Sequence, residues 1–125
     1  MKRIIPVILL FITYLVGCGI ALNALETENR NNILKVEVRM TKEDVNEIMG
    51  TKTVGYNDTT NPYKKESFHN ANNNLIEIYY YIIDRKAEFD NDKFTPVVFV
   101  DNIVEGVGWR SFEDAERKYQ IKISD

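Results

Sequence analysis

Apolar and polar positions divide the chain into three parts with different patterns. Residues 4–16 (IIPVILLFITYLV) form a continuous apolar run, whereas residues 26–32 (ETENRNN) are polar and show no periodicity. From residue 33 onward, apolar residues recur at the spacings of helices and strands, which indicates a packed core. The pattern therefore predicts one small domain over 33–125, joined to the apolar start by a flexible tether over 18–32.

The clearest helix signal covers residues 42–49. Thr41 is a good N-cap, and the acidic residues that follow it suit the positive end of the helix dipole. Gly50 supplies a left-handed stop. The expected inward face consists of Val45, Ile48 and Met49. An amphipathic stretch over 32–36 predicts another short helix before this one.

Three strands are predicted in the second half of the chain. Residues 75–86 are rich in β-branched and aromatic residues, which is typical of a strand. Alternation along this strand gives an expected core face of Ile76, Ile78, Tyr80 and Ile82. Residues 94–109 predict two further strands, joined by a tight turn at Asp101 and Asn102, which tolerate positive φ.

The remaining segments predict a loop and a final helix. Residues 51–74 are loop-rich, with one short strand expected near 53–56. Residues 111–121 predict a helix with Ser111 as its N-cap. The order of elements predicts an α+β domain, in which helices cover one side of a three-stranded antiparallel meander sheet.

The first residues resemble a bacterial lipoprotein signal. Lys2 and Arg3 give a positive start, and the apolar run is shorter than the roughly 20 residues needed to span a bilayer. The run is followed by Leu15-Val16-Gly17-Cys18, which matches the lipobox pattern. The resemblance implies that the signal, residues 1–17, is removed and that the Cys18 sulfur carries a diacylglycerol. Acyl chains on this residue would anchor the protein to a membrane.

Two other interpretations of this segment remain open. Residues 4–25 contain no charge, so an uncleaved, single-pass membrane helix is one alternative. The other is that Cys18 is a structural free cysteine. The residue after Cys18 is Gly19, where many two-membrane bacteria use an aspartate to retain lipoproteins in the inner membrane. Its absence favours the outer membrane, with the domain facing the periplasm.

Charge and cysteine content exclude several classes of protein. Of the 16 Lys and Arg residues, Lys2 and Arg3 precede Cys18, whereas all 19 Asp and Glu residues follow it. The folded part is therefore acidic and lacks the basic stripe that nucleic-acid binding needs. Because Cys18 is the only cysteine, we expect no disulfide in the domain.

A motif around the first predicted helix carries a family resemblance. Met40-Thr41 before the helix, Val45 within it and Ile48-Met49-Gly50 at its end follow a Met-Thr, Val and Leu-Gly pattern. This pattern resembles the BamE (SmpA/OmlA) family of outer-membrane lipoproteins, which has glycine where this chain has Arg39. The resemblance implies a fold shared with the β-lactamase-inhibitor protein and a role in outer-membrane assembly or maintenance. Residues 95–109 are similar to uncharacterised lipoproteins of the same superfamily, which favours a related subfamily over BamE itself.

The sequence offers little catalytic or metal-binding chemistry. His69 is the only histidine, and it is expected in a solvated polar loop. Glu88, Asp90 and Asp92 alternate like calcium ligands, but the glycine and distal glutamate of a calcium loop are missing, which favours a solvated turn. Because the chain also lacks a phosphate-binding glycine loop and a nucleophile elbow, we expect neither an enzyme nor a cofactor.

Aromatic residues remain as candidates for a binding surface. Tyr79, Tyr81 and Trp109 are the candidate partner-binding residues, because Tyr and Trp contribute much of the energy of protein interfaces. Tyr79 and Tyr81 lie on the strand face opposite Tyr80, so they are either covered by the last helix or exposed as a contact patch.

Together these patterns predict a lipid-anchored envelope protein that binds another envelope protein without catalysis. An inhibitor of a secreted hydrolase is the alternative, by analogy with the fold.

Overall fold

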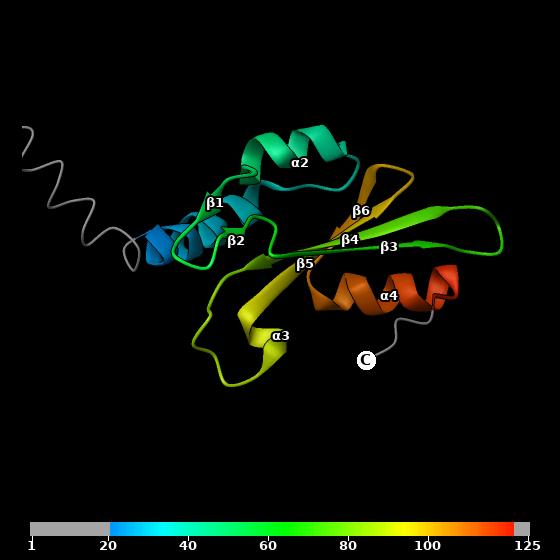
Figure 1. The fold of residues 1–125 in the computed structure, drawn as a ribbon. Coiled ribbons are helices and arrows are strands. Elements are labelled where there is room, and N and C mark those ends of the chain that lie inside the picture. The colour runs from blue at the N-terminus through cyan, green and yellow to red at the C-terminus, as the bar shows by residue number, and fades with distance from the viewer. Residues whose placement is uncertain (1–20, 122–125) are drawn as a thin grey trace, which may run out of the picture.

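Helices lie on both faces of an antiparallel sheet in the computed structural model, which describes residues 21–121 (Figure 1). A helix covers residues 21–32. The elements that follow are η1 (Ile33–Lys35), α2 (Lys42–Met49), β1 (Thr53–Val54), β2 (Thr59–Thr60), β3 (Lys64–His69), β4 (Leu75–Ile82), α3 (Asp90–Lys93), β5 (Phe94–Val100), β6 (Ile103–Val107) and α4 (Trp109–Tyr119). Cys18 and the expected signal lie outside the described residues. Within residues 21–121, no helix has the length and apolar character needed to cross a membrane.

The main sheet has four strands in the order β3-β4-β5-β6, so the predicted α+β class is confirmed but the three-stranded sheet is wrong. The additional strand, β3, lies in the stretch expected to be loop-rich and pairs with β4 from Lys64–Tyr80 to His69–Leu75. Most of its side chains are polar and exposed. It therefore lacks the apolar alternation that reveals a strand in the sequence. The short strand expected near 53–56 corresponds to β1, which pairs with β2.

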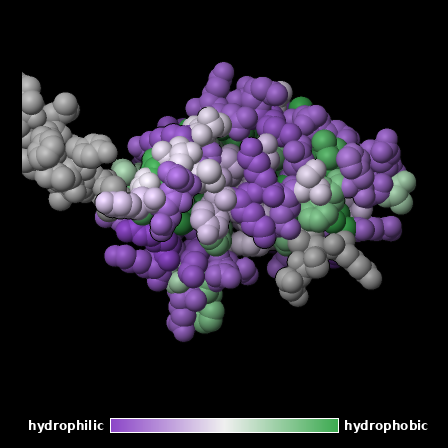
Figure 2. Space-filling model, viewed as in Figure 1, coloured by the Kyte–Doolittle hydropathy of each residue, from purple (hydrophilic) through white to green (hydrophobic). Residues whose placement is uncertain are grey.

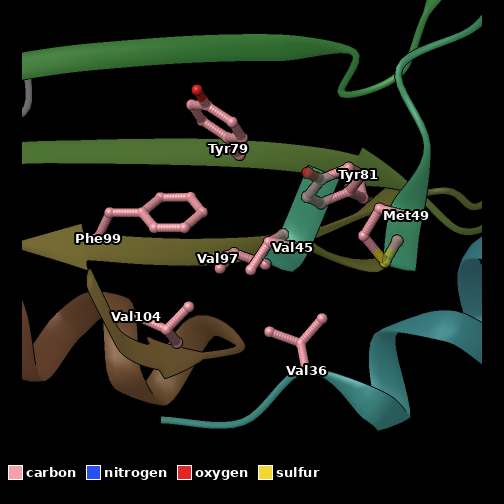
Figure 3. Packing of buried hydrophobic residues seen from close by; sticks show 8 residues of the cluster. All are labelled: Val36, Val45, Met49, Tyr79, Tyr81, Val97, Phe99 and Val104. Atoms are coloured by element: carbon pink, nitrogen blue, oxygen red, sulfur yellow. The ribbon is translucent and has the colours of Figure 1, made fainter. Parts of the chain in front are cut away.

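Both faces of β4 are buried, although only one was expected to face the core. On one face, Ile76 packs with Val98 of β5 and Ala115 of α4. On the other, residues from α2 and from the segment before it close over the sheet (Figure 3). This second cluster consists of Val36, Val45, Met49, Tyr79, Tyr81, Val97, Phe99 and Val104. The prediction of a sheet covered on one side is therefore wrong.

The helix α2 has the bounds that the sequence predicts. The Thr41 side chain accepts a hydrogen bond from Asp44 N at 3.1 Å, and Thr41 N donates to the Asp44 carboxylate at 3.0 Å. This reciprocal pair is a capping box, which satisfies donors that a helix start otherwise leaves free. Gly50 ends the helix with φ +77°. Local chemistry is therefore enough to define this element.

Residues 21–32 form a helix that packs on the domain, so the expectation of a flexible tether is wrong for them. Leu25 and Asn29 are buried. The Asn29 side chain donates to Ile82 O and to Asn61 Oδ1, both at 2.9 Å, and Asn61 in turn donates to Met49 O at 2.8 Å. Leu25 makes an apolar contact, whereas Asn29 and Glu26 are buried through polar contacts. The inward face of the helix therefore lacks the continuous apolar periodicity by which a helix is predicted from sequence.

The last hairpin is confirmed, whereas the start of the final helix is corrected. Asp101 and Asn102 have φ of +50° and +70°, as the tight turn requires. Helix α4 begins at Trp109 with Gly108 as N-cap, so Ser111 lies in the first turn and is not the cap. A Cβ placed on Gly106 would lie 2.5 Å from Ser111 Cβ. Glycine at this position therefore allows α4 to lie close against β6.

Candidate functional site

Tyr79 and Tyr81 lie in the core, so they are no longer candidates for partner binding, and of the two alternatives left open by the sequence the exposed contact patch is wrong. Their exposed fractions are 5% and 0%. They lie on the face that α2 covers, not beneath the last helix (Figure 3). Burial raises the pKa of both phenols, and the nearby Lys42 ammonium partly offsets this for Tyr79. These two residues contribute to packing and are not available to a partner.

Trp109, the third candidate, lies half-buried at the start of α4 and lines a surface groove. Its indole N–H donates to Asn91 O at 2.7 Å and to Phe94 O at 3.0 Å. Its ring lies 5.9 Å from that of Tyr80 and 5.2 Å from that of Phe112, measured between centroids. Trp109 therefore fixes α4 to the junction of α3 and β5. The groove that it lines is open to solvent.

The groove, which we call the Trp109 groove, has a volume of about 410 Å³ and lies between α4, α3 and the start of β3. Its aromatic lining consists of Tyr63, Tyr80, Phe94, Trp109 and Phe112. Tyr63 stacks on Phe94 with 5.1 Å between ring centroids. The face of the molecule in Figure 2 is mainly hydrophilic, and its hydrophobic residues form small separate groups.

The charged groups of the Trp109 groove are predominantly acidic. They are Lys64, Glu66, Asp90, Glu113 and Glu116. Lys64 Nζ lies 5.5 Å from the centroid of the Tyr80 ring and 3.7 Å from Glu66 Oε1. Burial, followed by the neighbouring Glu66 carboxylate, raises the pKa of the Tyr80 phenol. Tyr80 therefore stays neutral over the physiological range, and with an exposed fraction of 7% it forms the floor of the groove beneath Lys64.

The other predicted polar residues are not brought together in a site. His69 is exposed at the end of β3, so its expected place in a loop is corrected. Asp90 and Asp92 lie in the short helix α3. In the part of the chain that the structure describes, no three His, Cys, Asp or Glu side chains are close enough to hold a metal ion.

Tyr63 and Phe94 belong to the groove, but no sequence pattern pointed to them. Tyr63 precedes β3, and its backbone N–H donates to Tyr80 O at 2.8 Å. Its position therefore depends on the pairing of β3 with β4, which the sequence did not reveal. Phe94 opens β5 at the end opposite the predicted hairpin turn. The only local signal for the groove in the sequence is the single tryptophan, Trp109, with Phe112 three residues later.

Comparison of the chain with protein-family models, with curated proteins and with solved structures gave no match. The resemblance to the BamE family therefore remains a prediction based on the residues around α2.

Proposed function

We propose that this protein is a non-catalytic envelope lipoprotein, related to the BamE superfamily, that is anchored through Cys18 and binds another envelope protein through the Trp109 groove. The lipobox supports the anchor, and the absence of an aspartate after Cys18 favours the outer membrane. The assembly or maintenance of that membrane is the proposed process.

The observation that supports partner binding is the composition of the groove. Aromatic side chains gather in a recess beside exposed polar and charged residues such as Glu113 and Asp90. Protein interfaces commonly have this arrangement, in which buried aromatic residues supply the energy and a polar rim excludes water.

The intact mass of the protein purified from its membrane tests the anchor. We expect a chain that begins at Cys18 and carries the mass of the added acyl chains. The variant Cys18→Ser should keep the signal and gain no lipid. A native protein that retains Met1 and has the unmodified mass would overturn the lipoprotein assignment.

Site-specific crosslinking tests the binding surface. A photoreactive residue at Glu113, an exposed position of the groove, should capture an envelope protein in living cells. The matched control is Glu43, an exposed acidic residue on α2, which lies on the opposite face of the sheet (Figure 1). Equal capture from both positions, or capture from Glu43 alone, would contradict the proposal.

A further inference from the structure

We propose that the Trp109 groove selects a positively charged side chain, arginine or lysine, from a basic segment of its partner. The inference rests on the proposed function in taking the ligand to be a protein. It adds the charge that the ligand must carry. Three features of the groove support it: its charge, the cation that it already holds, and the exposure of that cation.

The charge of the groove favours a cationic ligand. Its lining contains four carboxylates, of Glu66, Asp90, Glu113 and Glu116, and one ammonium group, of Lys64. Glu66 is paired with Lys64 and Asp90 with Lys93, so Glu113 and Glu116 supply the excess negative charge. A recess with walls of one charge sign concentrates field lines and attracts groups of the opposite sign. An acidic segment would meet like charge on several sides, which is costly at an interface.

The protein's own Lys64 shows where such a cation fits. Its Nζ lies over the face of Tyr80, 5.5 Å from the ring centroid, with Glu66 Oε1 at 3.7 Å. A cation over an aromatic face is attracted by the ring quadrupole. An arginine of the partner would gain more, since a planar guanidinium stacks on aromatic rings and binds a carboxylate with two hydrogen bonds.

Lys64 is placed so that a partner can displace it. Its side chain is 61% exposed, and exposed ion pairs contribute little stability. In contrast, Lys42, which lies over Tyr79 at 5.8 Å, is 18% exposed and is paired with Glu77. The Lys42 contact is therefore part of the folded core, whereas Lys64 fills a site that is open to solvent.

Trp109 provides the readout for the test, because it is the only tryptophan in the chain. The mature protein, purified in detergent, is titrated with the peptide acetyl-Gly-Arg-Leu-Arg-Gly-amide while tryptophan fluorescence is recorded. The control peptide carries citrulline in place of arginine, which keeps the shape and removes the charge. We expect a saturable change with the arginine peptide and at least tenfold weaker binding of the citrulline peptide. Equal binding of both peptides, or no change with either, would overturn the inference.

Substitutions on β3 distinguish two effects on ligand binding: displacement of the Lys64 side chain by the ligand, and a general change in the charge of the protein. Lys64→Met and Lys65→Met remove the same charge from adjacent residues, but Lys65 lies over Tyr79 on the other face of the strand, with Nζ 5.0 Å from the ring centroid. If Lys64 competes with the ligand, Lys64→Met should lower the Kd of the arginine peptide about threefold, and Lys65→Met should lower it less. Glu116→Gln should raise the Kd about threefold. Equal effects of the two lysine substitutions would refute displacement.

The titration and the crosslinking experiment distinguish this inference from the proposed function. A partner captured at Glu113, together with equal binding of the arginine and citrulline peptides, would support partner binding and overturn the preference for charge. Selective binding of the arginine peptide without any capture at Glu113 would support the preference for charge and overturn the protein partner.

Discussion

Arg39 adopts a backbone conformation that residues with a side chain rarely adopt, with φ +80°. Glycine, which the BamE family has at this point, adopts it without steric cost. Two backbone hydrogen bonds hold the conformation here: Arg39 N donates to Val104 O at 3.0 Å, and Val104 N donates to Met40 O at 2.8 Å. Arg39 therefore occupies a position whose backbone conformation suits glycine better than arginine.

Arg39→Gly should stabilise the protein for this reason. Removal of the side chain relieves the steric strain, and the greater freedom of glycine in the unfolded state offsets part of the gain, which leaves about 1 kcal/mol. Chemical denaturation measures the change in the free energy of unfolding. Arg39→Ala is the matched control, because it removes the charge and keeps the Cβ. If alanine stabilises as much as glycine, backbone strain is not the cause.

Tyr81 has a buried hydroxyl without a hydrogen-bond partner among the described residues. Burying a hydroxyl without a partner costs free energy, so Tyr81→Phe should raise the free energy of unfolding by about 1 kcal/mol. Tyr79→Phe is the comparison. The Tyr79 hydroxyl lies near the Lys42 ammonium, so this substitution removes a favourable interaction. The melting temperature should therefore rise in Tyr81→Phe, and in Tyr79→Phe it should fall or rise clearly less. A lower melting temperature for Tyr81→Phe would show that the hydroxyl is satisfied.

At the scale of elements, the sequence predicts those that local chemistry defines. Thr41 and Gly50 mark both ends of α2, and Asp101-Asn102 marks the turn of the last hairpin. The strand β3 was missed because its polar edge position leaves no periodicity in the sequence. The helix over 21–32 was missed because side-chain amides fix it to distant residues.

The amide pair of Asn29 and Asn61 should hold the helix over 21–32 on the domain. Asn29→Ala removes the donor to Ile82 O and to Asn61 Oδ1, which are both in the buried part of this contact, and this should cost about 1–3 kcal/mol. Hydrogen exchange should become faster in residues 21–32 before it changes in the sheet. Asn31→Ala, at an exposed position of the same helix, is the control. The same exchange rates in both variants would mean that the amide pair does not fasten the helix.

At the scale of the whole molecule, the Trp109 groove shows why a site is harder to predict than a helix. Its aromatic residues come from the segment before β3, from β4, from β5 and from α4. The sequence singled out Trp109 by residue type, but it also singled out Tyr79 and Tyr81, which the fold buries. Which residues of the sheet are left at the edge of a groove depends on where the helices pack, and no single segment contains that information.

The docking of residues 21–32 also determines how the proposed anchor would hold the domain. Cys18 precedes Ala21 by three residues, which span at most about 11 Å. The turn between β1 and β2 lies against the start of this helix, since a Cβ on Gly55 would be 3.2 Å from Leu22 Cγ. The turn between β3 and β4 is at the opposite end of the molecule (Figure 1). A lipid on Cys18 would therefore place the first turn near the bilayer and the second far from it.

This orientation can be measured on the lipidated protein in vesicles that contain a headgroup quencher. Tyr56→Cys, in the first turn and 88% exposed, and Asn72→Cys, exposed in the second turn, each provide a thiol for a fluorophore. We expect stronger quenching at residue 56, because the short connection to Cys18 leaves the domain little freedom to turn. Without Lys2 and Arg3 the lipidated chain has 14 Lys and Arg residues against 19 Asp and Glu residues, and this negative net charge gives no attraction to anionic lipid that could produce the same result. A flexible insert of about 20 Gly and Ser residues between residues 20 and 21 should remove the difference, since such a chain reaches well beyond the spacing of the two turns. Equal quenching at both positions without the insert would mean that the helix over 21–32 does not orient the domain.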